Sequence, residues 1–137
     1  MACINKEIVI EAPPEHVWAA VRDIGAVHER LTPGILVDTH PDGDKRVLTF
    51  ARRAVVRELI VALDDEQRRR AYAVVEGSKQ PTYHHGSMQV EASSSGGSQF
   101  VWITDLLPHE QAARIAAIVE RGAEVMKQTL ESSKPRI

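Results

Sequence analysis

Cysteine is almost absent from this sequence, and the single one, Cys3, excludes an internal disulfide. Long apolar runs are missing too. The N-terminus lacks the apolar segment of a signal peptide, and no stretch elsewhere approaches the length of a membrane span. We therefore expect a soluble, cytoplasmic protein without an integral membrane segment.

Neither sign of charge is in large excess. The 17 basic and 19 acidic residues give a formal net charge of −2. Because no strong basic field is available, nucleic acid is not expected as the main partner. Arginines do cluster at positions 68–70, beside acidic residues at 64–66. Charge runs are usually solvated, so we interpret this one as an exposed hairpin turn.

The motifs of metal and cofactor chemistry are missing as well. The six histidines do not have the spacing of metal ligands. The sequence contains no nucleophile elbow, no phosphate-binding glycine motif and no dinucleotide fingerprint. We therefore expect neither a metal nor a cofactor.

The size and composition of the chain are those of an ordinary globular protein. It has 137 residues, of which 43% are apolar and 26% are charged. This length suits one domain with its own core, and the stretch "SSSGGS" is too short to link two domains. We expect a single domain over residues 1–137.

Alternating and branched apolar residues predict seven strands separated by turn signals. The expected strands cover residues 4–11, 35–40, 45–53, 54–63, 69–77, 83–92 and 98–107. After the first of them, "APPEHVWAAVRDI" predicts a helix that begins at the prolines, and a second short helix is expected over 24–30. Because the last six strands are sequential, we expect an antiparallel meander.

The period changes from Pro108 onward, where apolar residues recur every three or four positions. This pattern predicts an amphipathic helix of roughly 20 residues. Gly122 lies on its apolar face, where glycine costs about 1 kcal/mol relative to alanine. Its presence indicates the close approach of either a sheet or a bound molecule.

The order of these elements resembles the helix-grip fold of the START-like superfamily, also called SRPBCC. That superfamily includes the birch pollen allergen, polyketide cyclase/dehydrase proteins and plant abscisic acid receptors. The resemblance rests on "IVIEAPPEHVWAAVRDIG", "RELIVALDDEQRRRAYAVVEG" and "FVWITDLLP". It implies an α+β fold in which a curved seven-stranded antiparallel sheet wraps around the long C-terminal helix, with a cavity between them.

Two adjacent histidines stand in the stretch "YHHGSMQVEA". Neighbours in a strand point to opposite faces, so we expect His84 to face the apolar interior and His85 to face water. Gly86 and Met88 share the face of His84. Gly86 is expected to widen the cavity, and Met88 to supply an adaptable apolar contact.

The resemblance to the hormone receptors places Tyr72, Val74 and His84 at ligand-facing positions, and it matches Glu58 to a carboxylate used for polar ligand contact. Alternation alone does not choose between Glu58 and Arg57, because both faces of that strand are apolar. Trp102 is left open between a core role and a ligand contact. The predicted ligand-binding residues are Glu58, Tyr72, Val74, His84, Met88 and Trp102.

The candidate catalytic residues are His84, Glu58 and Tyr72. A histidine beside a buried carboxylate shares a proton with it, which raises the pKa of the histidine and lowers that of the carboxylate. Such a pair would anchor a hydroxyl, carbonyl or carboxylate of a ligand. The three side chains would alternatively satisfy one another in an unoccupied core.

Three functions follow as hypotheses. The first is binding of a small, largely hydrophobic molecule, such as a lipid, polyketide or aromatic metabolite, in an internal cavity. The second is an enzyme of cyclase, dehydratase or isomerase type, in which His84 or Glu58 moves a proton and Tyr72 hydrogen-bonds a carbonyl oxygen. The third is an interaction or stress protein whose cavity is incidental and which acts through its surface or as a homodimer.

Overall fold

Seven strands form one antiparallel sheet in the computed structural model, which describes residues 2–77 and 80–134. The strands are β1 (Ala2–Ile10), β2 (Leu36–Asp42), β3 (Lys45–Phe50), β4 (Val55–Asp64), β5 (Arg69–Gly77), β6 (Tyr83–Ala92) and β7 (Ser98–Leu107). Their order in the sheet, β1-β7-β6-β5-β4-β3-β2, makes the last six a meander and places β1 beside β7. The predicted meander is confirmed, and β5, β6 and β7 have the predicted bounds.

Helices fill the connection after β1 and the C-terminal region. They are α1 (Pro14–Arg22), α2 (Val27–Arg30), the 3₁₀ turn η1 (His109–Gln111) and α3 (Ala112–Ser132). α1 begins at Pro14, whose fixed φ suits a first helical turn. α2 is shorter than predicted because a turn closed by the Ala26 N–H and the Asp23 carbonyl precedes it. No helix within the described ranges combines the length and the apolar character that a bilayer crossing requires.

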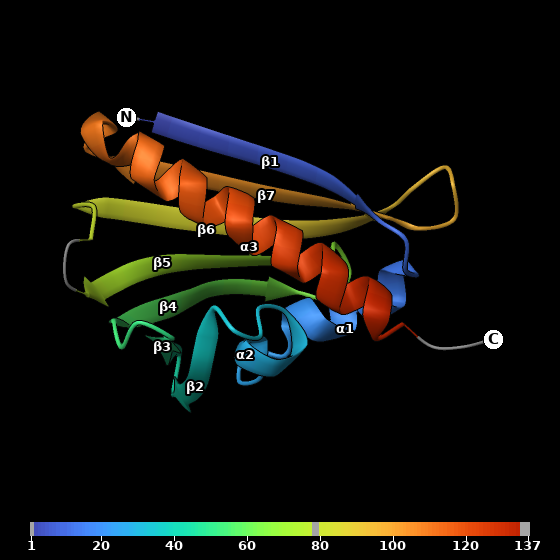
Figure 1. The fold of residues 1–137 in the computed structure, drawn as a ribbon, viewed down its shortest axis with the longest axis horizontal. Coiled ribbons are helices and arrows are strands. Elements are labelled where there is room, and N and C mark those ends of the chain that lie inside the picture. Colours follow the sequence, from blue (N-terminus) through green and yellow to red (C-terminus); the bar gives the residue numbers. More distant parts are fainter. Residues whose placement is uncertain (1, 78–79, 135–137) are drawn as a thin grey trace.

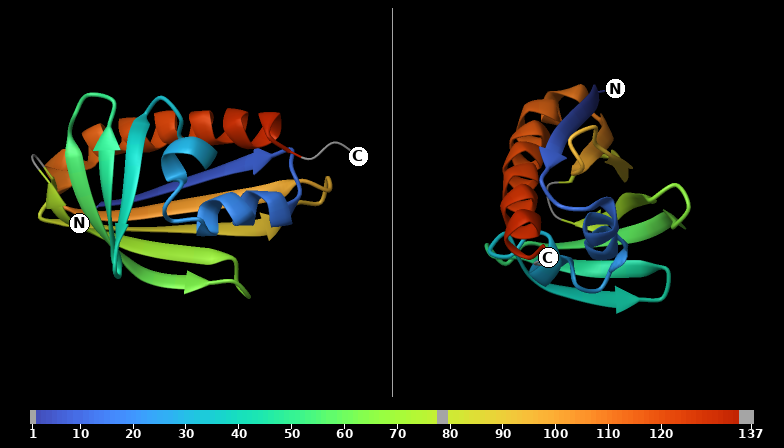
Figure 2. Two further views of the ribbon diagram at one scale, coloured as in Figure 1. Left: turned by 90° about the horizontal axis from the view of Figure 1, so that it is seen from below. Right: turned by 90° about the vertical axis from the view of Figure 1, so that its right-hand side faces the viewer.

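The sheet is strongly curved, and α3 runs along its concave face (Figure 1). The register of β4 against β5 shifts between Arg57 and Glu58 and again between Ile60 and Ala62. Bulges of this kind bend a strand and increase its twist. Figure 2 shows that β2 and β3 consequently run across the direction of β1 and β7. The predicted helix-grip fold is confirmed.

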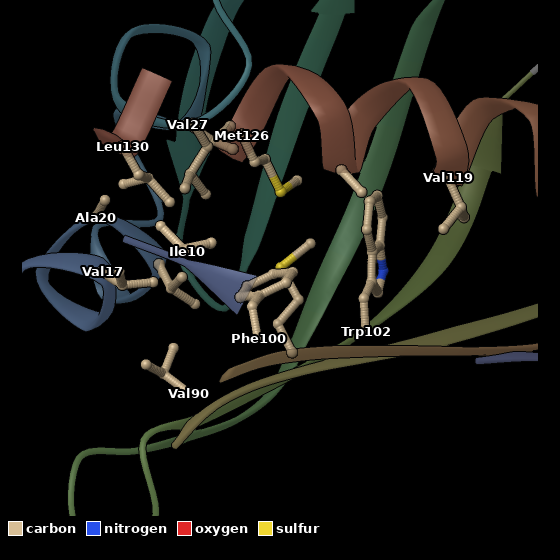
Figure 3. Packing of buried hydrophobic residues seen from close by; sticks show 14 of the residues in the cluster. Ile10, Val17, Ala20, Val27, Val90, Phe100, Trp102, Val119, Met126 and Leu130 are labelled. Carbon is tan, nitrogen blue, oxygen red and sulfur yellow. The ribbon is translucent and has the colours of Figure 1, made fainter. Parts of the chain in front are cut away.

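The core lies between α3, α1 and the concave face of the sheet (Figure 3). Phe100 of β7 and Leu130 of α3 are fully buried, as are Val17 and Val21 on one face of α1. Burial of a side chain of this size contributes about 1.5–3 kcal/mol relative to leaving it in water. The apolar residues whose spacing predicted the helices are therefore, for the most part, the residues that the helices bury in the core.

Glycine allows the closest contacts on this concave face. Gly86 lies opposite Tyr72 in the β5–β6 pair, and a Cβ at this position would overlap the Tyr72 ring. The prediction that Gly86 widens the cavity is wrong, because Tyr72 occupies the space that the missing side chain leaves. At Gly122, a Cβ would lie 3.2 Å from the indole of Trp102. The close neighbour that Gly122 indicated is thus the sheet.

Replacing Gly86 with alanine should destabilise the fold by about 1–3 kcal/mol, because the added methyl group must displace the Tyr72 ring. Urea denaturation measures this cost. In a Tyr72→Ala background the same substitution should cost little, since alanine is otherwise tolerated in a strand. An equal cost in both backgrounds would contradict the assigned contact.

Candidate functional site

A cavity of about 140 Å³ lies between α3 and strands β3 to β7. Apolar side chains of α3 form one wall, among them Ile115, Val119 and Met126. The facing wall comes from the concave side of the sheet, where charged and polar side chains are interspersed with Leu48 and Val56. The cavity therefore combines a largely apolar surface with a few polar groups, which is typical of small-molecule sites.

The side chains predicted for ligand contact come together around this cavity. The lining includes Glu58, Tyr72, Val74, His84, Met88 and Trp102. The strand pairing explains this, because Tyr72 lies opposite Gly86, and Met88 lies opposite Trp102. The sequence did not decide which face of β7 lines the cavity. In the structure, Trp102 lies on that face. The roles of these residues toward a ligand stay predictions.

Glu58 is buried and forms an ion pair with Arg46. Both Nε and Nη2 of Arg46 donate to Oε1 of Glu58, over 3.0 and 2.8 Å. The third nitrogen, Nη1, donates to the carbonyl of Ile24 over 3.2 Å. Arg46 and Glu58 are directly opposite in the β3–β4 register, so the pair spans neighbouring strands. Arg57, in contrast, points outward and pairs with Asp42 and Glu76.

His84 does not share a proton with Glu58 as predicted. The Glu58 carboxylate is engaged by Arg46, and the buried Nδ1 of His84 has no hydrogen-bond partner in the described structure. Burial lowers the pKa of His84, and this effect outweighs the opposing attraction of Glu58. The imidazole is therefore neutral at pH 7, with a ring nitrogen held in a wall of the cavity.

Tyr72 and Trp102 are joined by a hydrogen bond, in which the indole Nε1 donates to the Tyr72 hydroxyl over 3.0 Å. Burial is the main cause that raises the pKa of Tyr72 to about 12, so the hydroxyl keeps its proton at neutral pH. The ring of His84 is tilted against that of Tyr72, with 6.3 Å between the ring centroids. This arrangement leaves the Tyr72 hydroxyl as a hydrogen-bond donor at the cavity.

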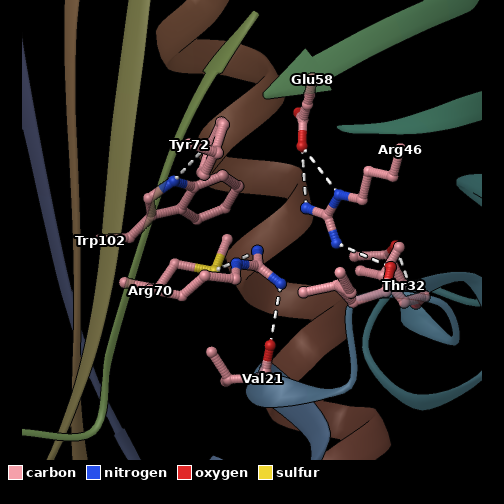
Figure 4. A network of polar contacts seen from close by, with 10 residues as sticks. Val21, Thr32, Arg46, Glu58, Arg70, Tyr72 and Trp102 are labelled. Carbon is pink, nitrogen blue, oxygen red and sulfur yellow. Dashed lines mark hydrogen bonds and ion pairs between the residues drawn. The ribbon is translucent and has the colours of Figure 1, made fainter. Parts of the chain in front are cut away.

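Arg70 is the functional candidate that the sequence analysis missed. Its side chain is buried at 1% exposure, so interpreting the whole arginine run at 68–70 as solvated was wrong. Nη1 donates to the Val21 carbonyl over 2.9 Å, and Nη2 lies 3.1 Å from the sulfur of Met88 (Figure 4). The alternation of side chains along β5 would have predicted the burial of Arg70, because Arg70 shares a face with Tyr72 and Val74.

The comparisons with known proteins identify the family. The family model described as "Polyketide cyclase / dehydrase and lipid transport" matches residues 1–134. The chain belongs to this family. The START-like resemblance read from the sequence is thereby confirmed, whereas no curated protein matches the chain.

Solved structures of several other proteins have a fold similar to that of this chain. The protein XoxI from Bacillus cereus is 18% identical, with a TM-score of 0.83 over 97% of this chain and 95% of that chain. Ara h 8.0201 is 16% identical, with a TM-score of 0.74 over 96% and 99%. Norcoclaurine synthase from Thalictrum flavum is 18% identical, with a TM-score of 0.70 over 96% and 84%. At these identities the likeness shows the fold alone.

One end of the cavity of this polyketide cyclase / dehydrase family member reaches the surface. Ile118 of α3 contributes to the lining although it is 44% exposed, and Gln80 and Arg114 also contribute. An exposed apolar residue that continues into a cavity marks its entrance. Within residues 2–77 and 80–134, the acidic, histidine and cysteine side chains form no cluster suited to a metal ion.

The Arg46–Glu58 pair should be sensitive to removal of one partner. Glu58→Leu leaves a buried cation without its counter-ion, which should cost about 3–5 kcal/mol of unfolding free energy in chemical denaturation. The double variant Glu58→Leu/Arg46→Met should recover most of this loss, since a buried ion pair replaced by apolar side chains is often neutral. Asp42→Leu, which breaks the exposed pair with Arg57, is the control and should cost less than about 1 kcal/mol. Equal costs at the two sites would contradict this account.

Proposed function

We propose that this protein binds a small, largely apolar molecule in the cavity between α3 and the sheet. The observation that carries the proposal is the cavity wall itself. Apolar side chains of α3 and the sheet surround a space whose lining also includes three residues with polar side chains, Tyr72, His84 and Arg70. Such an arrangement holds an apolar body by burial and fixes its orientation through a few hydrogen bonds.

The volume limits the size of the ligand. An engineered apolar cavity of about 150 Å³ in another protein binds one benzene molecule. The 140 Å³ cavity of this chain therefore suits a molecule of about one ring, or a short branched chain. A long acyl lipid or a fused polyketide requires the larger volume of about 300–1,000 Å³ that drug-sized ligands occupy. Among the classes suggested by the sequence, a small aromatic metabolite fits best.

A pair of neighbouring residues on β5 tests this proposal. Val74 lines the cavity, whereas Val75 is 49% exposed on the other face of the strand. Val74→Phe should weaken binding of benzyl alcohol, a neutral one-ring probe, by about tenfold or more because the added ring occupies the site. Val75→Phe, the matched control, should leave it unchanged. Isothermal titration calorimetry measures both affinities.

Equal affinities of the two variants would contradict the assigned site. Failure of the wild-type protein to bind any one-ring probe would contradict ligand binding itself. That result would favour an interaction or stress protein in which the cavity is incidental.

A second candidate function is proton transfer on the bound molecule. The observation that favours it is the neutral His84, whose Nδ1 has no hydrogen-bond partner in the described structure. A neutral imidazole beside a bound ligand can accept a proton, and the Tyr72 hydroxyl can donate a hydrogen bond to a carbonyl oxygen. Glu58 is the weaker candidate for a base, because Arg46 already occupies Oε1.

Enzyme and binding protein are distinguished by His84→Gln. In an enzyme, this substitution should abolish isomerisation of a one-ring enolisable ketone while changing its affinity by less than about threefold. The wild-type rate should fall with acidity only below the ordinary histidine pKa of about 6.5, because burial lowers the pKa of His84 and keeps the base neutral down to a more acidic pH. His85→Gln is the matched control on the other face of β6. Unchanged turnover in His84→Gln would exclude His84 as the base.

A further inference from the structure

Arg70 introduces a buried positive charge that lacks a counter-ion. Its guanidinium lines the cavity, but among the described residues it forms no ion pair with a carboxylate. Its Nε is buried and has no hydrogen-bond partner in the described structure. A buried ion is costly unless it is paired and hydrogen-bonded. This side chain is therefore the least satisfied charged group of the site.

The contacts of Arg70 offset only part of this cost. The Val21 carbonyl belongs to the last turn of α1, where the helix dipole amounts to about half a negative charge. The Tyr72 ring adds a cation–π contact, with 5.7 Å between the guanidinium carbon and the ring centroid. The Met88 sulfur is a weak acceptor. None of these groups carries a full negative charge.

Glu58, the acidic residue in the cavity lining, is already paired with another arginine. Glu58 receives two hydrogen bonds from Arg46, so the charges of that pair cancel. Figure 4 shows the guanidinium groups of Arg46 and Arg70 approaching from opposite sides of the site. Burial, followed by repulsion from Arg46, lowers the pKa of Arg70 to about 9, which leaves it charged at neutral pH. The described interior thus holds an excess of one positive charge.

We propose that the cavity is selective for small monocarboxylic acids with an apolar body, and that Arg70 binds the carboxylate. The carboxylate accepts hydrogen bonds from Arg70 and from the Tyr72 hydroxyl, while the apolar body packs against Met88, Trp102 and Val119. One ligand charge matches the one excess charge among the buried residues of the site, Arg46, Glu58 and Arg70. A charge-assisted bond to arginine is roughly twice as strong as a neutral hydrogen bond. This inference rests on the proposed function, since it names the class of ligand for the same cavity.

The test compares three one-ring probes of similar size at pH 7, where a carboxylic acid is ionised. They are benzoate, the neutral benzyl alcohol and the doubly charged phenyl phosphate. Calorimetry on the wild-type protein should give benzoate an affinity about tenfold or more above that of either other probe. Benzoate should also change the fluorescence of Trp102 in a Trp18→Phe background, in which Trp102 is the only tryptophan of the chain.

Two substitutions at Arg70 assign the preference to this side chain. Arg70→Met keeps an extended side chain but removes the charge, so it should abolish the preference of the protein for benzoate over benzyl alcohol. Arg70→Lys keeps the charge and should retain a preference for benzoate. Arg69→Met removes an arginine from the adjacent position on the other face of β5, and is the matched control that should change neither affinity.

The outcomes separate this inference from the proposed function. If benzyl alcohol binds as tightly as benzoate to the wild-type protein, the monocarboxylate inference is wrong, whereas ligand binding stands. Tighter binding of phenyl phosphate would replace the monocarboxylate with a phosphate ester. If none of the three probes binds, the proposed function itself fails. The wild-type comparison decides these points even if Arg70→Met does not fold.

Discussion

The buried ion pair between Arg46 and Glu58 is the interaction on which the site depends. The two residues are direct partners across β3 and β4, so the same register that forms the meander brings the charges together. Each ion alone would cost several kcal/mol in this interior. Because Arg46 also binds the Ile24 carbonyl, the pair connects the sheet to the segment that follows α1. The Oε1 atom of the carboxylate is thereby held by Arg46.

A second arginine makes the interior electrostatically asymmetric. Arg70 extends from β5 to the Val21 carbonyl at the end of α1, close to the point that Arg46 reaches from β3. Arg70 therefore binds the negative end of the α1 dipole, and Arg46 binds the segment that follows α1; together these contacts hold this region over the sheet. The partial charge at the end of α1 stabilises the guanidinium of Arg70 without neutralising it.

The cavity walls depend equally on close contacts between glycine and aromatic residues. The Tyr72 ring lies over Gly86 of the neighbouring strand, and the Trp102 indole lies against Gly122 of α3. Their mutual hydrogen bond satisfies the indole N–H inside the protein, where it would otherwise be costly to bury. The remaining space beside them is the volume that a ligand would occupy. Both glycines thus allow close contact with an aromatic ring, and Gly122 also lines the cavity.

Much of the site was predictable from the sequence, because side chains alternate between the two faces of a strand. Every second residue of a predicted strand is therefore expected on the same face. This placed His84 and Met88 together and put Tyr72 beside Val74. The same rule pointed to Arg70, but the charge run around it favoured a solvated turn. Glu58 was harder, because a bulge next to Arg57 breaks the alternation and both faces of β4 are apolar. Only the resemblance to known receptors selected it.

The sequence by itself determined the strands, the long helix, their order and the family, since periodicity and turn residues act over a few neighbouring positions. The tertiary structure alone decided the partners of the buried charges. Arg46 is far from Ile24 along the chain, and Arg70 is far from Val21, so nothing local encodes those contacts. The lowered pKa of His84 likewise has burial as its largest cause. Electrostatic environment depends on distances in space, which only the folded chain defines.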